Sequence, residues 1–298
     1  MGQASMSASE LAAFVQHIAD EFVGGPENVI EPASGPEPAW EQPLLGFAAG
    51  DDPLWRKYKI NIIGPYYWTP LEAFRQAYPN DTAEAKDLSV ISWVLPQTSA
   101  TKREQARQKD MSAERWARTR VMGEKRVNVG LRKRMVNALL ERGVMAVAPQ
   151  ILPQWFRLRM PQGYQYSSCW SERHTAHAAG LGTFGLCDGL ITPKGKAHRL
   201  GSVVVKHALP IVPRPYSRYD EYCPFLKSGR CGACMKRCPV GALDENGHNK
   251  ELCSAFLWDK TNPHIRDNWH FEGISCGLCQ VGVPCESGIP KAAQRATS

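Results

Sequence analysis

The sequence predicts a mixed α/β protein in which an α/β domain is followed by a second, cysteine-rich module. Strand-like apolar runs alternate with helical patterns over the first two thirds of the chain, which favours an α/β layer. Eight of the ten cysteines lie between Cys223 and Cys285. The length of 298 residues suffices for about two domains. A chain this long can bury a large core without disulfide bonds, so the cysteines need another explanation.

Residues 1–50 are expected to form an N-terminal arm. Apolar side chains recur at helical spacing from Leu11 to Phe22, which predicts a short amphipathic helix. The stretch 24–43 is rich in proline and glycine and predicts an extended segment. We expect little chemistry in this part of the chain.

Residues 51–215 are expected to form the α/β domain. The apolar run 88–95, which Pro96 ends, predicts a strand. A basic helical region follows, in which apolar side chains recur at helical spacing over 131–139 until Gly143 stops the helix. The runs 144–148 and 202–205 predict two further buried strands.

The cellular context follows from what the chain lacks. No apolar run approaches the ~20 residues that span a bilayer. The first lysine or arginine is Arg56, so the basic region of a secretory signal is missing from the start of the chain. We therefore expect a cytoplasmic protein that does not associate with membranes. In a reducing compartment, clustered cysteines more often indicate metal or redox chemistry than disulfides.

The net charge of +7 is concentrated in one segment. Residues 102–134 contain 12 lysines and arginines but only four acidic residues. One interpretation is a solvated helix face. The other is a surface for an anionic partner such as RNA, an acidic electron donor or a phosphate-bearing cofactor.

Residues 216–298 are expected to form a ferredoxin-like module. The run Cys231-Gly-Ala-Cys234-Met-Lys-Arg-Cys238-Pro239 matches the last three positions of the bacterial ferredoxin pattern C-x2-C-x2-C-x3-C-P. Its expected first position falls on Ser228. Cys223 is the nearest upstream thiol, and we expect it to be the displaced first ligand.

A second group of thiols completes two sets of four. Cys276, Cys279 and Cys285 lie close together in the sequence, and Cys253 precedes them. In two-cluster ferredoxins the cysteine before proline crosses to the other cluster. By this logic, the first thiol set is Cys223, Cys231, Cys234 and Cys285, and the second thiol set is Cys238, Cys253, Cys276 and Cys279. Each set would hold one 4Fe-4S cluster, which transfers single electrons.

Zinc is the alternative occupant, because four-cysteine zinc sites also use C-x2-C pairs. The Cys-Pro step after an x3 spacing favours iron–sulfur clusters over zinc. The two remaining cysteines, Cys169 and Cys187, lie outside the module and are interpreted as ordinary buried side chains.

Residues 164–199 hold the densest set of candidate functional groups. Gly180, Gly182 and Gly185 formally meet the spacing G-x-G-x-x-G, but no strand directly precedes them, so nicotinamide binding is not favoured. Glycines still permit close approach of the backbone to a large flat or anionic cofactor.

A resemblance to a known superfamily becomes specific in this region. The run Gly180-Leu-Gly-Thr-Phe-Gly-Leu-Cys-Asp-Gly-Leu-Ile-Thr-Pro193 continues through His198-Arg-Leu-Gly-Ser-Val-Val-Val205 to the cysteine module. It resembles the shared core of the cobalamin-dependent reductive dehalogenases and epoxyqueuosine reductases. The resemblance covers roughly residues 85–290 and implies a nitroreductase-like core that holds cobalamin beside two 4Fe-4S clusters.

The resemblance also implies roles for individual residues. It places the corrinoid against the glycine-rich run and its neighbours, namely Gly180, Leu181, Gly182, Gly185, His174 and Thr192. It makes Tyr166, six residues before Glu172, the proton donor: epoxyqueuosine reductases carry a carboxylic acid there and the dehalogenases use a tyrosine. Lys206 or Arg199 would stabilise the phenolate that remains after proton transfer.

The sequence therefore predicts a corrinoid and iron–sulfur reductase. Its substrate would be a small organic molecule, such as an organohalide, or a nucleoside-like one. Its electrons would come from a low-potential donor such as ferredoxin or flavodoxin. Two alternatives remain: a cobalamin-free electron-transfer or activating protein, and a tRNA-modifying enzyme whose basic segment 102–134 binds phosphates.

Overall fold

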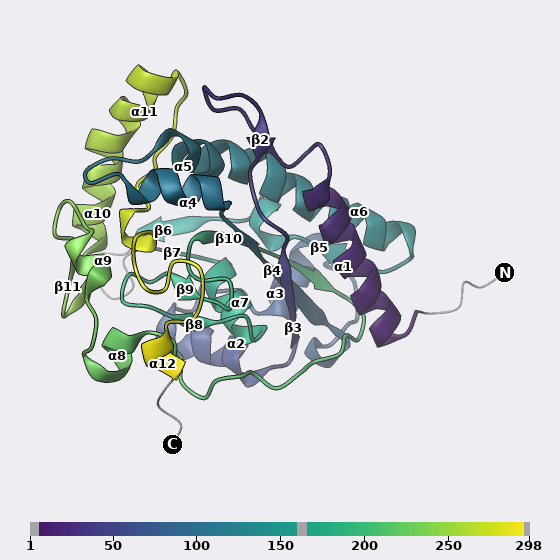
Figure 1. The fold of residues 1–298 in the computed structure, drawn as a ribbon. Helices are drawn as coiled ribbons and strands as arrows, with labels where there is room; N and C mark the ends of the chain where they lie inside the picture. The colour runs from purple at the N-terminus through teal and green to yellow at the C-terminus, as the bar shows by residue number, and fades with distance from the viewer. Residues whose placement is uncertain (1–5, 160–165, 295–298) are drawn as a thin grey trace.

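The computed structural model describes residues 6–159 and 166–294 as a mixed α/β protein, which confirms the predicted class at this level. A four-stranded sheet in the order β3-β4-β10-β5 forms its centre (Figure 1). The four strands are β3 (Leu44–Ala49), β4 (Ser89–Pro96), β5 (Ala146–Val147) and β10 (His198–Val205). All three neighbouring pairs are antiparallel, with Val203 opposite Ile91 and Val204 opposite Val147.

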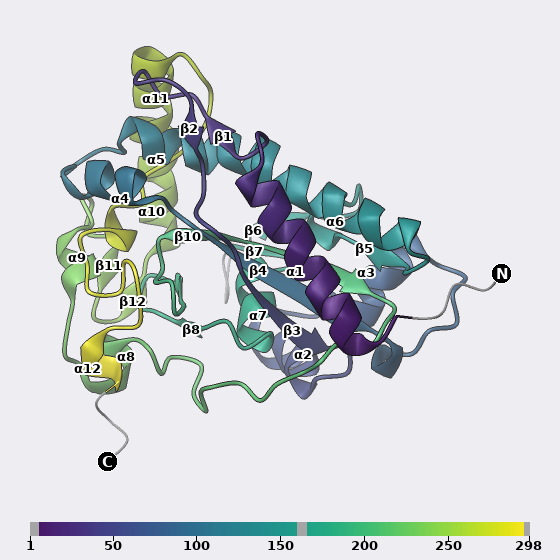
Figure 2. The ribbon, with the colours of Figure 1, turned by 45° about the vertical axis from the view of Figure 1, so that its right-hand side comes forward.

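The central sheet is buried on both faces because helices cover each of them (Figure 2). Alternate residues of a strand point to opposite faces. Accordingly, Ile91 and Trp93 belong to a core with α1 (Ala8–Gly24) and α6 (Val129–Glu141). Val90 and Val94 belong to the opposite core. The helices on that side are α2 (Pro53–Lys57), α3 (Pro70–Ala77) and α7 (Glu172–Ala178).

Two parts of the predicted N-terminal arm are integrated into the domain. Helix α1 begins at a capping box in which Ser7 and Glu10 bond each other's backbone. Its apolar stripe, including Leu11 and Val15, packs in the core beside α6. Strand β3 pairs with β4 in the central sheet. Between them lie the two-residue strands β1 (Val29–Ile30) and β2 (Glu37–Pro38). The apolar stripe is the physical reason that this segment does not extend freely.

The basic segment is largely helical. It runs through α4 (Ser99–Ala106), α5 (Glu114–Arg118), the π-helical η3 (Thr119–Asn128) and α6. Several of its cations form ion pairs within the chain, such as Arg115 with both Glu37 and Glu104 and Arg118 with Glu114. Part of the positive charge that the sequence concentrates here therefore stabilises the fold.

The remaining elements are short. Those before residue 216 are η1 (Tyr58–Ile62), η2 (Ala85–Asp87), η4 (Pro149–Ile151), β6 (Arg157–Arg159), β7 (Tyr166–Ser168), β8 (Thr183–Phe184) and β9 (Leu190–Ile191). The cysteine-rich segment contains α8 (Pro224–Ser228), α9 (Ala233–Lys236), β11 (Leu243–Asp244), β12 (Gly247–His248), α10 (Lys250–Phe256), η5 (Leu257–Thr261), α11 (Asn262–Trp269), η6 (Leu278–Gln280) and α12 (Lys291–Gln294). This segment lies together at one side of the central sheet (Figures 1 and 2).

A buried polar network joins the sheet to both helical layers. The fully buried guanidinium of Arg132 donates to Glu124 (3.0 Å), Glu172 (3.3 Å) and the Leu200 carbonyl (3.1 Å). Ser202 donates to Glu172 (2.6 Å). Burial raises the pKa of Glu172, while Arg132 opposes that rise. Glu172 therefore links helix α7 to strand β10 through Ser202 and has a structural role there.

Candidate functional site

The four cysteines of the first thiol set surround one small cavity. Its lining includes Cys223, Cys231, Cys234 and Cys285, together with Lys196. Cys223 precedes α8, Cys231 and Cys234 flank the start of α9, and Cys285 comes from the loop after η6. Cys231 is exposed and the other three are buried, so the cavity lies near the surface at one edge.

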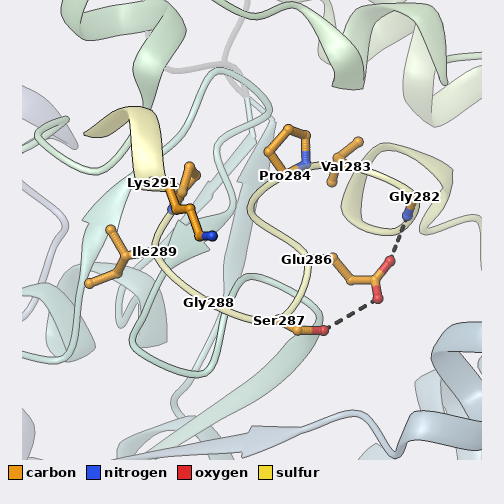
Figure 3. A pocket seen from close by; sticks show the side chains of 9 residues that line it. Gly282, Val283, Pro284, Glu286, Ser287, Gly288, Ile289 and Lys291 are labelled. Carbon is orange, nitrogen blue, oxygen red and sulfur yellow. Dashed lines mark hydrogen bonds between the residues drawn. The ribbon is translucent and has the colours of Figure 1, made fainter. Parts of the chain in front are cut away.

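The loop that carries Cys285 is held by its own side chains and by the preceding domain. The Glu286 carboxylate accepts hydrogen bonds from the Gly282 amide (2.6 Å) and the Ser287 hydroxyl (3.3 Å), and the loop surrounds an outer hollow of about 560 Å³ (Figure 3). On the other side, the Lys196 amide donates to the Cys285 carbonyl (2.9 Å) and the Ala197 amide to the Glu286 carbonyl (3.2 Å). These bonds fix Cys285 beside the glycine-rich segment.

The second thiol set is less uniform. The Cys276 thiol interacts electrostatically with Cys253 and Cys238, and burial followed by these neighbours raises its pKa to about 12. The Cys279 thiol instead shares a hydrogen bond with Cys187. Arg237 fixes the loop that contains Cys279, because its guanidinium donates to the carbonyls of Leu278 (3.3 Å) and Val281 (3.1 Å).

The chemistry of these donors suits iron–sulfur clusters. Cysteine thiolates are the usual ligands of such clusters, and burial raises the pKa of Cys234 to about 11, so metal must displace its proton. Within residues 6–159 and 166–294, no three His, Cys, Asp or Glu side chains are grouped as a site for a single metal ion. The assignment of the eight cysteines to two clusters remains a prediction.

Cys187 and Lys196 form a pair that the sequence did not single out as functional. Lys196 Nζ donates to Cys187 Sγ (3.4 Å), and both side chains are buried. Burial alone would lower the pKa of Lys196, but the thiols of Cys187 and Cys285 raise it. Cys187 is buried, as the sequence predicted, and its thiol lies between Lys196 and Cys279. The available signal for this pair was the position of Cys187 in the glycine-rich run 180–193, which Lys196 follows by three residues.

The residues that the resemblance assigns to the corrinoid make packing contacts and hydrogen bonds within the chain. Gly182 and Gly185 abut Ile191 of β9, so the missing side chains serve chain packing. Leu181 belongs to the domain core, and the Thr192 hydroxyl donates to the Gly195 carbonyl (2.8 Å).

Two further members of this set behave similarly. Gly180 has a φ of +78° and lies against Arg214 and Pro215. His174 is buried, with Nδ1 bonded to the Ser171 hydroxyl (2.8 Å) and its ring against Tyr58. All six residues therefore make contacts within the chain, and their role beside a corrinoid remains a prediction.

Tyr166 lies beside Arg159, whereas the sequence analysis expected Lys206 or Arg199 there. It begins β7, is partly exposed, and its ring lies 5.6 Å from the Arg159 guanidinium. Tyr164, the first residue of the candidate region 164–199, lies outside the described residues. Lys206 binds Asp81 through two bonds of 2.8 and 2.9 Å.

Arg199 is the second residue of β10 and Lys206 follows the last, so their Cα atoms lie about 23 Å apart at the usual rise per residue. At most one of them could therefore lie beside the Tyr166 phenolate. Arg159 is the cation that contacts Tyr166, and the pairing of β6 with β7 brings it there, with Arg159 opposite Tyr166. A hairpin register of this kind depends on the fold, which is why the sequence did not identify Arg159.

Arg199 belongs instead to a group of arginines with few acidic partners. Its guanidinium donates to the Arg120 carbonyl (3.2 Å) and lies 3.7 Å from Glu124. The charge of Arg199, together with burial, lowers the pKa of Arg120, and the charges of Arg157 and Arg173 act in the same direction. Arginine remains protonated in proteins, so these guanidinium groups repel one another, and Glu124 offsets part of that repulsion.

A comparison with known protein sequences finds a relative of the expected kind. The chain is 34% identical over 126 residues to the epoxyqueuosine reductase of Staphylococcus aureus, a match that covers 40% of this chain and 30% of that protein. This similarity confirms the expected resemblance to epoxyqueuosine reductases. The aligned part spans less than a third of that relative. No protein-family model matches the chain.

Solved structures were compared as well. A crystal structure of an epoxyqueuosine reductase with an epoxyqueuosine-modified tRNA stem loop aligns with 16% identity and a TM-score of 0.49, covering 96% of this chain and 68% of that one. A catabolic reductive dehalogenase in complex with 3-bromo-4-hydroxybenzoic acid aligns with 12% identity and a TM-score of 0.48, covering 97% of this chain and 38% of that one.

None of the helices described here is both long and apolar enough to cross a membrane.

Proposed function

We propose that this chain is an iron–sulfur reductase whose eight clustered cysteines would hold two 4Fe-4S clusters. When bound, the clusters would supply one-electron transfer from a low-potential donor such as ferredoxin or flavodoxin to a bound substrate. The observation that supports it most directly is the cavity lined by Cys223, Cys231, Cys234 and Cys285. The similarity to a named reductase supports the same class. In this proposal residues 51–215 form a nitroreductase-like core and residues 216–298 a ferredoxin-like module.

The proposed substrate is small and anionic or nucleoside-like. The arginine group of Arg120, Arg157, Arg173 and Arg199, with Glu124 as its nearby carboxylate, supports an anion. A phosphate or carboxylate there would relieve the repulsion among the guanidinium groups and accept their hydrogen bonds. A tRNA substrate is the second candidate, because the S. aureus relative is an epoxyqueuosine reductase.

Tyr166 is the proposed proton donor. The substrate would take electrons from the clusters and a proton from the Tyr166 hydroxyl, and solvent would return the proton to the phenolate. A phenol is protonated at neutral pH, and the Arg159 guanidinium over the ring would stabilise the negative charge that forms. Partial exposure of Tyr166 gives solvent access for this return.

The proposal that the chain also uses cobalamin rests on the sequence resemblance. When bound, cobalamin would supply low-valent cobalt chemistry. The six residues first assigned to it are occupied by internal contacts, and this observation favours the cobalamin-free electron-transfer protein as the competing function. The two functions differ in whether the loaded protein retains a corrinoid.

Anaerobic reconstitution with iron, sulfide and cobalamin tests these alternatives. About eight iron atoms per chain support the two clusters. With that iron content, one retained corrinoid supports the cobalamin-dependent reductase, and no corrinoid favours the electron carrier. Two zinc ions without iron contradict the entire proposal.

The role of Tyr166 requires a matched pair of variants. Tyr166→Phe removes the hydroxyl while keeping the ring, and we expect a loss of turnover of about 10²-fold or more at unchanged iron content. Tyr219→Phe alters a tyrosine that is 62% exposed and should retain full turnover. Full turnover in Tyr166→Phe would refute the assignment. For the tRNA candidate, the absence of measurable tRNA affinity at low salt is the contradicting result.

A further inference from the structure

Lys196 is a buried cation at the cavity of the first thiol set. Its side chain is only 3% exposed, and it lines the same cavity as Cys223, Cys231, Cys234 and Cys285. Nζ donates to Cys187 Sγ at 3.4 Å. Among the ion pairs of residues 6–159 and 166–294, none joins Lys196 to a carboxylate. The groups that the structure places around this ammonium are therefore thiols rather than carboxylates.

A buried ammonium is costly unless an anion compensates it. Neutral thiols compensate it poorly, because they are only weak acceptors. A 4Fe-4S cluster with its four thiolate ligands is anionic, and each electron that it accepts adds one negative charge. The surroundings of Lys196 therefore suit a cavity that holds an anionic cluster better than one that holds none.

The backbone fixes Lys196 to the loop that carries a ligand. Its amide donates to the Cys285 carbonyl at 2.9 Å, so the two residues are direct neighbours across the two segments. Gly195, immediately before it, has a φ of +82° and leaves no room for a side chain against Glu286. The backbone of Lys196 is therefore held beside a proposed ligand of the cluster.

We propose that Lys196 raises the reduction potential of the cluster bound by the first thiol set, and thereby makes that cluster the preferred acceptor of the incoming electron. The inference rests on the proposed iron–sulfur function. In the step concerned, a low-potential one-electron reductant is oxidised and the cluster is reduced. No bond to the substrate changes, and a fixed positive charge stabilises the reduced form more than the oxidised form.

The test is a redox titration of the loaded protein with dithionite, followed by electron paramagnetic resonance. Lys196→Met keeps the aliphatic stem and removes the charge. We expect one of the two cluster potentials to fall by about 59 mV or more, which is a tenfold weaker affinity for one electron. Lys196→Arg keeps the charge and should restore at least half of that shift. Lys196→Gln provides a second neutral side chain if the methionine variant does not retain iron.

Lys236→Met is the matched control. Lys236 lies between Cys234 and Cys238 in the sequence but is exposed, so solvent screens its charge and neither potential should move comparably. Unchanged potentials in both neutral Lys196 variants, at full iron content, would overturn the role of Lys196 while leaving the iron–sulfur function intact. A wild-type protein that binds no iron and sulfide would instead refute the proposed function itself.

Discussion

Replacing Gly195 by alanine should separate the two segments that meet at the first thiol set. Gly195 has a φ of +82°, and a Cβ there would lie closer than 3.0 Å to the backbone carbonyl of Glu286. That contact belongs to a backbone seam in which Lys196 bonds Cys285 and Ala197 bonds Glu286. The backbone of residue 195 fixes the position of the Cβ, and the atoms that it meets are backbone atoms, so neither side of the clash can rotate away.

The expected cost has two parts. A left-handed conformation costs a non-glycine residue roughly 1–2 kcal/mol. Forcing extra volume into a closely packed site costs about 1–3 kcal/mol more. The sum of roughly 2–5 kcal/mol is a large share of the ~5–15 kcal/mol that stabilises a typical domain. The seam should therefore open, and Cys285 should move away from the other three thiols.

Gly229 provides a control within the same module. It has a φ of +69°, but nothing lies within 4 Å of a Cβ built there, so Gly229→Ala pays only the conformational cost. We would compare the urea midpoints of the iron-loaded proteins by tryptophan fluorescence, and their iron contents after gel filtration. Gly195→Ala should lose about 1–3 kcal/mol more than Gly229→Ala and about half of its iron. Equal midpoints for the two variants, with full iron in Gly195→Ala, would refute this reasoning.

Three further predictions concern the core and the clusters. Arg132→Met leaves the buried Glu172 without its cation and leaves the partly buried Glu124 with Arg199 as its remaining ion-pair partner. The free energy of unfolding should fall by about 3–5 kcal/mol, measured by urea denaturation, and a loss below about 1 kcal/mol would contradict the network. Cys234→Ser should reduce iron from about eight atoms to about four, whereas Cys169→Ser, outside both sets, should keep all of it; equal iron content in the two variants would remove Cys234 from the ligand set. Burial lowers the pKa of His198 from 6.5 to about 4, and its Nε2 donates to the Leu190 carbonyl (2.8 Å). The unfolded chain therefore binds more protons between these values, so His198 should cost up to roughly 3 kcal/mol of stability as the pH falls from 6.5 toward 4. His198→Gln should show a shallower decline than wild type over that range, the exposed His17→Gln should not, and identical slopes in wild type and His198→Gln would contradict this origin.

Local patterns predicted the elements that carry strong periodicity. The apolar run 88–95 corresponds to β4, and the helical spacing over 131–139 corresponds to α6, which ends just before Gly143 with a φ of +74°. Both signals are local because burial on one stripe or on two faces imposes a repeat along the chain. The spacing of Cys231 and Cys234 is also a local signal, since both lie at the start of α9 and line one cavity.

Long-range placement could not be predicted in the same way. Residues 1–50 contain too little periodicity to show that β3 joins the central sheet, and strand order depends on pairing between distant segments. The glycines of residues 180–185 illustrate the limit. A glycine permits close approach of a cofactor or of the chain itself, and only the fold reveals that Ile191 fills the space beside Gly182 and Gly185.

The sequence by itself determined that this protein has an α/β domain, a cysteine-rich segment suited to iron and a resemblance to a superfamily of reductases, because composition, periodicity and motif spacing are properties of neighbouring residues. Only the tertiary structure decided that Lys196 is buried among thiols, that Arg159 accompanies Tyr166, and that Lys206 and Arg199 are far apart. The burial of Lys196 depends on the pairing of distant backbone segments, the Arg159–Tyr166 contact on the register of the β6–β7 pair, and the separation of Lys206 from Arg199 on the extent of β10. Packing throughout the core fixes these features, and a local pattern of residue types does not specify them.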